Sequence, residues 1–261
     1  MRKKSAIFIT VRTTSSRLPQ KALLKIRNQR VIEHVIDRAK LCKNANLVVL
    51  CTTTNKEDDV LVDIAKRKKI KSFRGSEKDK LVRWRDAARE FKIDYFATFD
   101  GDDFFCSPIL VDLSILQMSK NPCDIIQAPQ GLICGSFTFC ISVKALEKVC
   151  EIKDSNETEM MWGYFTETGL FSVNNLQVRN PLYFNSKIRM TLDYAEDFAF
   201  FYRIYDRMHM KKNNVDLIKI IKMLNKNPDI PKINIFRQTQ FLQNQKNKTN
   251  ILLKKNINYE N

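Results

Sequence analysis

Residues 6–21 read AIFITVRTTSSRLPQK, an apolar run that passes directly into a basic, hydroxyl-rich loop. Residues 6–11 have the length and the β-branched and aromatic content of a buried strand. The same unit recurs through the first half of the chain: an apolar strand, a polar turn and a segment with apolar residues at helical spacing. This alternation predicts an α/β, Rossmann-like fold, with a mixed, mostly parallel sheet flanked by helices. The expected elements are strands at 6–11, 47–52, 70–73 and 95–99, and helices at 31–42, 57–68 and 78–91.

The second half of the chain is less regular. Strands are expected near residues 124–127, 137–141 and 170–173, and helices near 195–208 and 215–225. After Pro231 the sequence becomes rich in Lys, Asn and Gln, and its last part is typical of a frayed helix or a disordered tail. We therefore expect a catalytic domain over residues 1–236 and a basic, polar C-terminal tail over residues 237–261.

Composition narrows the class of protein. The chain has 261 residues, 44% of them apolar, which suits one substantial domain. No apolar run approaches the roughly 18 residues of a membrane span, and the seven cysteines show no CxxC spacing. We expect a cytoplasmic protein with reduced thiols and no transmembrane segment. The net charge of +16 would suit a nucleic-acid partner, but residues 211–261 hold 11 Lys or Arg against 3 Asp or Glu. Half of the surplus lies there, so we expect no nucleic-acid partner.

The loop after the first strand has the composition of a site for a polyanion. Residues 12–21 contain three cations and four hydroxyl groups, directly after a buried strand. Arg12 and Arg17 can each bind phosphate oxygens with a forked guanidinium, and Lys21 can act as a point charge on a leaving pyrophosphate. A solvated basic turn is the alternative. The position favours the phosphate site, because ligands of such sheets bind beyond the carboxyl ends of the strands.

Two acidic segments are candidates for a metal site. The first is DGDD at residues 100–103, directly after the strand at 95–99. Carboxylate oxygens at a strand end suit Mg²⁺. An ordinary Asp-Gly turn is the alternative. The second segment is RMTLDYAED at residues 189–197. There Asp193 is expected at a helix N-cap, with Glu196 completing a capping box, which is a sufficient structural explanation.

Three stretches together resemble a known family. Arg12, the SRLPQK run of residues 16–21 and the ALLKI that follows it resemble the nucleotide-binding signature of sugar cytidylyltransferases. The resemblance is to the spore-coat polysaccharide cytidylyltransferase family and, more distantly, to 3-deoxy-manno-octulosonate cytidylyltransferase. It continues through CTTTNKEDD at residues 51–59 and FRGSEKD at residues 73–79. The chain departs from the family at Thr14 and Gln20, where glycine is usual.

The resemblance implies a nucleotide-diphosphosugar transferase fold and an activity. The activity is CTP-dependent transfer of CMP to a sugar-like acceptor, an acidic sugar or a sugar phosphate, with release of pyrophosphate, for surface polysaccharide or glycoconjugate synthesis. A Gly-Asp pair supplies a metal ligand in the family, and residues 189–197 resemble its second metal-binding strand end, so Asp102 and Asp193 would hold Mg²⁺ while Glu196 and Asp197 serve the helix. Asp100 replaces an uncharged residue of the family pattern, and we expect it as a further ligand that widens the metal site. The implied nucleotide-binding residues are Arg12, Ser16, Arg17, Lys21, Arg74 and Ser76, and the implied catalytic residues are Arg12, Lys21 and Asp102.

The acceptor and the competing functions are less defined by the sequence. The aromatic segment at residues 159–165 could line an acceptor pocket or form a subunit contact, so a homodimer is possible. A glycosyltransferase that uses the Asp100-Gly-Asp102 sequence as a metal motif would share the fold, but it has no need of a loop for expelling pyrophosphate. A nucleic-acid-binding protein is the non-enzyme alternative, and the acidic candidate site is evidence against it.

Overall fold

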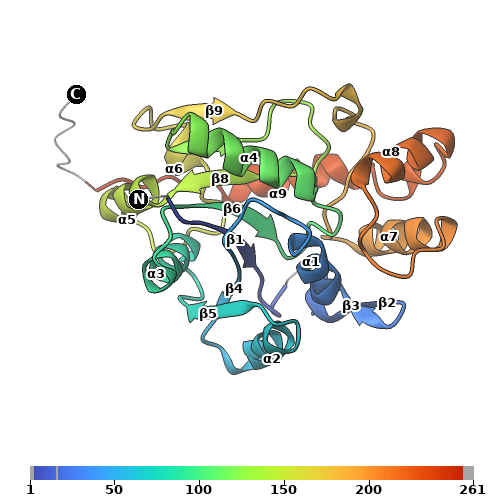
Figure 1. Cartoon of the computed structure of the whole chain (residues 1–261), viewed down its shortest axis with the longest axis horizontal. Helices are drawn as coiled ribbons and strands as arrows, with labels where there is room; N and C mark the ends of the chain where they lie inside the picture. The colour runs from blue at the N-terminus through green and yellow to red at the C-terminus, as the bar shows by residue number, and fades with distance from the viewer. Residues whose placement is uncertain (1–2, 16, 255–261) are drawn as a thin grey trace.

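A computed structural model describes residues 3–15 and 17–254 (Figure 1). Its main sheet has seven strands in the order β5-β4-β1-β6-β8-β7-β9. The first four of these pair in parallel, β8 runs antiparallel to β6 and β7, and β9 is parallel to β7. The predicted mixed, mostly parallel sheet is therefore confirmed. The strands are β1 (Ser5–Thr10), β4 (Leu47–Thr53), β5 (Lys71–Gly75), β6 (Tyr95–Asp100), β7 (Ile125–Gln127), β8 (Phe139–Ser142) and β9 (Val173–Asn175).

Helices cover both faces of the sheet. One core contains the inward residues of α1, α2, α4, α7 and α8, and the other those of α3, α5 and α6. Strand β1 supplies both cores because its side chains alternate: Ile7 and Ile9 enter the first, Ala6 and Phe8 the second. The helices are α1 (Val31–Ala39), α2 (Asp59–Arg67), α3 (Lys80–Phe91), α4 (Pro108–Lys120), α5 (Val143–Ile152), α6 (Gly163–Thr166), α7 (Ala195–Arg207), α8 (Leu217–Lys226) and α9 (Arg237–Lys248).

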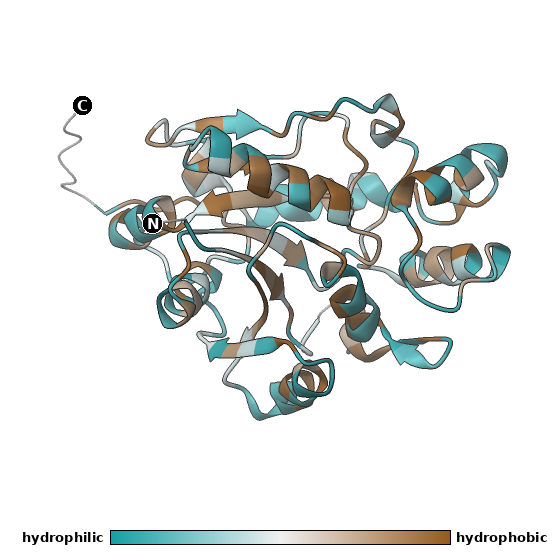
Figure 2. Cartoon of the chain, in the orientation of Figure 1, coloured by the Kyte–Doolittle hydropathy of each residue, from teal (hydrophilic) through white to brown (hydrophobic). Residues whose placement is uncertain are grey.

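The hydropathy pattern follows this layering. Figure 2 shows the central strands coloured as hydrophobic and the outer helices divided between apolar and polar faces. Within the core, the rings of Phe8 and Phe96 stack with centroids 4.3 Å apart. Trp84 of α3 is also buried, and its indole Nε1 donates to the Thr10 hydroxyl at 2.8 Å. That bond ties α3 to the carboxyl end of β1, where the loop at residues 12–21 follows.

Minor elements complete the fold. A hairpin of β2 (Lys25–Ile26) and β3 (Gln29–Arg30) precedes α1. Four short 3₁₀ turns lie at Lys21–Leu23, Lys56–Asp58, Pro181–Tyr183 and Pro231–Ile233. All seven cysteines are free thiols. Over residues 3–15 and 17–254, none of the helices is both long enough and apolar enough to cross a membrane.

Candidate active site

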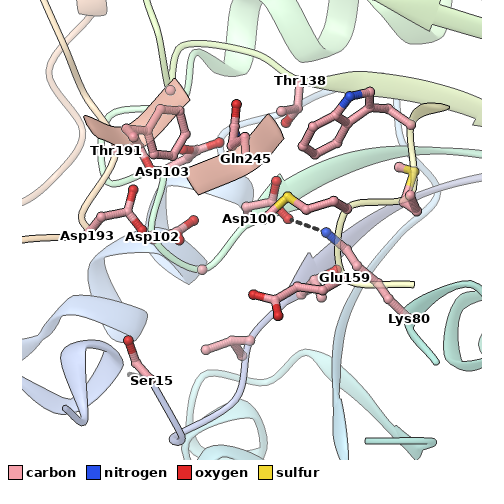
Figure 3. Close-up of a pocket in the computed structure, with 18 of the residues that line it drawn as sticks. Ser15, Lys80, Asp100, Asp102, Asp103, Thr138, Glu159, Thr191, Asp193 and Gln245 are labelled. Carbon is pink, nitrogen blue, oxygen red and sulfur yellow. Dashed lines mark hydrogen bonds and ion pairs between the residues drawn. The ribbon is translucent and has the colours of Figure 1, made fainter. Parts of the chain in front are cut away.

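A cavity of about 450 Å³ opens at the carboxyl ends of β1 and β6. The two ends are level, because Thr10 pairs with Asp100 in the strand register. The walls of the cavity come from the loops after β1 and β6, from residues 159–162 and from α9. Figure 3 shows Asp102, Asp103 and Asp193 grouped on one side, with Lys80 and Glu159 opposite them. The cavity therefore lies beyond the carboxyl ends of the strands, where the sequence predicted ligand binding.

The loop at residues 12–21 is fixed at its start by a carboxylate. Asp58 is buried and accepts from the Thr13 backbone N–H at 2.8 Å and the Thr13 hydroxyl at 2.7 Å. It also accepts from the hydroxyls of Thr52 and Thr53 at the end of β4. Burial by itself would raise the pKa of Asp58, but the hydrogen bonds from Thr53, Thr13 and Thr52 outweigh it and lower the pKa. Asp58 therefore joins the loop to the neighbouring strand as a stable anion.

Gln20 lies further along the same loop, at a position where the family usually carries glycine. Its φ of 51° is in the left-handed region, which a residue with a Cβ adopts at a cost of roughly 1 kcal/mol. The turn therefore keeps the backbone conformation that favours glycine. A 3₁₀ turn begins at the next residue, Lys21, and the Lys21 backbone N–H donates to the Leu18 carbonyl.

Lys21 brings the two predicted metal ligands together. Its Nζ donates to Asp102 Oδ2 at 2.6 Å, to the Leu192 carbonyl at 2.7 Å and to Asp193 Oδ1 at 3.1 Å. Burial would lower the pKa of this amine, but the charges of Asp102 and Asp193 more than compensate and raise it. Two carboxylates that are distant in the sequence thus face each other across one ammonium group.

Asp193 is fully buried and is held by cations on both sides. Arg17 and Lys21 contact one of its carboxylate oxygens, and Arg189 Nη2 donates to the other at 2.8 Å. Burial raises the pKa of Asp193, but the charges of Lys21, Arg17 and Arg189 lower it further than burial raises it. The side chain is therefore an anion aimed at the cavity.

The expected capping role of Asp193 is wrong. The N-cap of α7 is Tyr194, and the carboxylate that serves the helix start is Asp197. Its Oδ2 accepts from the backbone N–H groups of Asp193 and Tyr194 at 2.8 and 3.0 Å. Glu196 instead pairs with Arg237 at 2.7 Å. The Asp193 carboxylate takes no part in the cap, because it accepts instead from the side chains of Arg17, Lys21 and Arg189.

The loop after β6 adds further carboxylates. Asp103 is buried, and burial together with the charges of Asp102 and Asp100 raises its pKa well above the usual range. Burial likewise raises the pKa of Asp102, which Lys21 only partly offsets. Asp100 turns towards Lys80, whose Nζ lies 3.4 Å from its carboxylate (Figure 3). Such a concentration of negative charge around one ammonium suits an added cation.

A divalent cation fits this arrangement. In the described part of the chain, no three His, Cys, Asp or Glu side chains form a ready metal cluster. Mg²⁺ does not need one, because it takes one or two carboxylates and fills its other positions with water and phosphate oxygens. Asp102 and Asp193 are two such carboxylates, beside a loop whose Arg12, Arg17 and Lys21 line the same cavity.

The remaining predicted residues are placed less directly. Ser16 lies outside the described residues. Arg74 donates to the carbonyls of Thr53 and Asn55, so it links β5 to the end of β4. Ser76 accepts from the Asp79 backbone N–H at 3.1 Å. Neither side chain is among the described residues that line the cavity; from the same segment the lining residues are Glu77, Lys78, Lys80 and Arg83.

Comparison with known proteins identifies the family. The family model described as "Cytidylyltransferase" matches residues 6–248. This chain belongs to the cytidylyltransferase family. It is therefore a CTP-dependent nucleotidyltransferase, as the resemblance in residues 12–26, 51–59 and 73–79 implied. This membership favours nucleotidyl transfer over the glycosyltransferase and nucleic-acid-binding alternatives.

This cytidylyltransferase matches several relatives over nearly the whole of their length. An uncharacterized protein of Methanocaldococcus jannaschii is 32% identical, over 87% of this chain and 93% of its own. The spore coat polysaccharide biosynthesis protein SpsF of Bacillus subtilis is 25% identical, over 85% and 94%. A solved cytidylyltransferase from Leptospira borgpetersenii superposes with a TM-score of 0.79 at 25% identity, over 87% and 96%. The expected fold is confirmed by this likeness.

Two features around this cytidylyltransferase's cavity were not expected from the sequence: one supports the loop at residues 12–21 from outside the cavity, and the other lines the cavity. The first is Asp58, whose neighbours in CTTTNKEDD belong to the resemblance but gave no sign of its contact with Thr13. The second is α9, from the segment interpreted as a frayed or disordered tail. Residues 237–248 are helical, and the helix contributes Gln238, Phe241, Leu242, Gln245 and Lys248 to the lining. The domain boundary at residue 236 stays a prediction.

Proposed function

We propose that this enzyme transfers CMP from CTP to an acidic sugar or a sugar phosphate, releases pyrophosphate, and serves surface polysaccharide or glycoconjugate synthesis. The observation that carries the proposal is the Lys21 ammonium, which contacts Asp102 and Asp193 beside an arginine-bearing loop in one cavity. A cation loop for the triphosphate and a carboxylate pair for a metal are the two parts that nucleotidyl transfer requires. The name of SpsF, a spore coat polysaccharide biosynthesis protein, supports the choice of pathway class.

The nucleotide would bind along the loop at residues 12–21. Arg12 and Arg17 line the cavity and can exchange their present partners, Glu159 and Asp193, for phosphate oxygens. The Lys21 ammonium group would stabilise the negative charge of the leaving pyrophosphate. Asp102 and Asp193 would hold Mg²⁺, which when bound neutralises charge on the triphosphate.

The reaction is an in-line displacement at the α-phosphorus. A bond forms from the acceptor oxygen to this phosphorus, and the bond to the bridging oxygen of pyrophosphate breaks. Where the acceptor is a hydroxyl group, its proton must be removed. Asp100 is our candidate for that role, because its carboxylate lines the cavity and lies 3.4 Å from the Lys80 ammonium group.

The acceptor would lie at the end of the cavity formed by β8, residues 159–162 and α9. Trp162 and Met160 provide an apolar wall there. The Thr138 hydroxyl oxygen is buried and, within the described chain, has no hydrogen-bond partner. Gln245, which lines the same end, uses its side chain in no hydrogen bond to a described residue. Unmatched polar groups beside an apolar wall favour an acceptor with several hydroxyl groups.

The test is pyrophosphate release by the purified protein with Mg²⁺. Each of the four nucleoside triphosphates is paired with a panel of acidic sugars and sugar phosphates. We expect release with CTP and one class of acceptor. Release with another nucleotide would overturn the choice of base, and failure to bind CTP in calorimetry would overturn the proposal. Whether the enzyme is a homodimer stays a prediction, which light scattering of the same sample tests.

A further inference from the structure

Arg189 is a fully buried cation next to the active site. Its side chain is 0% exposed and is absent from the described cavity lining, so it cannot reach a ligand. Nη2 donates to Asp193 at 2.8 Å, and Nε donates to Asp197 at 3.0 Å. The guanidinium thus connects the carboxylate that faces the cavity to the carboxylate that caps α7.

Helix α9 completes the surroundings of this guanidinium. The third nitrogen, Nη1, donates to Gln238 Oε1 at 3.0 Å, its one hydrogen-bond partner among the described residues. The ring of Phe241, one turn further along α9, lies 4.2 Å from the Arg189 Cζ. A buried guanidinium that lies against an aromatic face gains a cation–π attraction that also fixes its plane. Gln238 and Phe241 therefore hold both the edge and the face of Arg189.

Other contacts join α9 to the same segment. Arg237 pairs with Glu196 at 2.7 Å, and Asn244 donates to the Tyr194 hydroxyl at 3.0 Å. Just before the helix, the Asn234 amide donates to Asp197 at 2.9 Å. The segment that carries Asp193 is thus bound to α9 at several points.

The three cations on Asp193 differ in what they can do when nucleotide binds. Arg17 and Lys21 line the cavity and are drawn towards phosphate oxygens in the proposed complex. Arg189 is enclosed and keeps its contact with Asp193. During binding, the orientation of the Asp193 carboxylate therefore depends on Arg189, and the orientation of Arg189 depends on α9.

We propose that helix α9 belongs to the active site, and that Gln238 and Phe241 act as positioning residues that hold Asp193, through Arg189, in the geometry for the metal–nucleotide complex. The inference rests on the proposed function, which assigns Asp193 to the metal. It replaces the view of the segment after residue 236 as an accessory tail. Groups that orient a metal ligand from behind typically contribute tenfold to a hundredfold to metal affinity.

The test measures CTP binding by calorimetry in the full-length protein, without acceptor, once with Mg²⁺ and once with EDTA. The quantity compared is the ratio of the Kd without metal to the Kd with metal. We expect this ratio to fall about tenfold in Gln238→Met and Phe241→Leu. Gln238→Glu, which keeps an oxygen acceptor for Nη1, should retain most of the ratio. Gln243→Ala is the matched control, since Gln243 lies on the exposed side of α9 and its side chain bonds, among the described residues, only to Asn247.

Thermal unfolding of the same variants separates positioning from simple packing. A lower Tm with the wild-type ratio in Gln238→Met and Phe241→Leu would mean that α9 only stabilises the fold, and it would overturn the inference. If the wild-type protein binds CTP equally with and without Mg²⁺, the metal assignment itself fails and the inference falls with it. The two failures are distinguishable, because the second appears in the wild-type protein alone.

Discussion

Replacing Lys21 by methionine would remove a cation that contacts both Asp102 and Asp193. Methionine keeps most of the length and the apolar stem of the side chain but donates no hydrogen bond. In the described chain, Asp102 has no other ion-pair partner, whereas Asp193 keeps Arg17 and Arg189. The cost of the substitution should therefore fall mainly on Asp102.

The size of that cost follows from the exposure of Asp102. Removing one partner of a buried ion pair costs about 3–5 kcal/mol, because a charge is left buried and unpaired. The Asp102 side chain is 25% exposed, so solvent recovers part of this, and we expect a loss of about 2 kcal/mol in the free energy of unfolding. A divalent cation should restore stability, because it can occupy the space between the carboxylates that Lys21 no longer fills. Added Mg²⁺ should thus stabilise Lys21→Met more than it stabilises the wild-type protein.

Urea unfolding with and without Mg²⁺ tests this reasoning. Lys25→Met is the control, since Lys25 is exposed on the β2–β3 hairpin. Equal stability of Lys21→Met and wild type in EDTA, or an equal response of both to Mg²⁺, would refute the assignment of Lys21 as counter-ion of a metal site. Pyrophosphate release should fall at least about 100-fold in the same variant, and wild-type rates would remove Lys21 from the mechanism.

Three further outcomes follow from the site. Asp102→Asn should raise the Mg²⁺ concentration for half-maximal pyrophosphate release at least about tenfold, and unchanged activation would undo its assignment as ligand. Asp58→Asn should cost about 2 kcal/mol in urea unfolding at neutral pH, because the carboxylate holds Thr13. Because the folded-state pKa of Asp58 is lowered, its contribution to the free energy of unfolding is present above the unfolded-state pKa and is lost as the pH falls through the folded-state pKa. The difference in stability between Asp58→Asn and wild type should therefore disappear in acid. A difference that persists in acid would contradict the role of the Asp58 carboxylate. Thr138→Val and Gln245→Ala should each raise the acceptor KM about tenfold in steady-state kinetics, whereas a raised KM for CTP would move these side chains to the nucleotide.

The first half of the fold could be predicted because its signals are local. Strands β1, β4 and β6 are short apolar runs, and the helices between them have one apolar face. Observed and expected bounds there differ by a few residues, for example Val31–Ala39 for α1 against the expected 31–42. The position of the site followed from the fold, because ligands of such sheets bind at the carboxyl ends of the strands.

Two features of the second half could not be predicted, for physical reasons. Helix α4 was not anticipated because it is apolar nearly all round, with Ile109 and Leu116 exposed opposite its buried face, so no helical period stands out. The capping error arose because three acidic residues lie within five positions, 193–197. Which of them caps α7 depends on Arg189 and Asn234, and those contacts are tertiary.

The charge of residues 211–261 has little to do with what α9 contributes. That segment holds half of the net +16. In the structure, however, the two α9 side chains that contact Arg189 are uncharged, Gln238 and Phe241. A buried guanidinium already carries the positive charge that Asp193 and Asp197 require, so a lysine at either position would add repulsion. The neutral residues of a basic helix are therefore the ones that contact Arg189 and, through it, orient the Asp193 carboxylate.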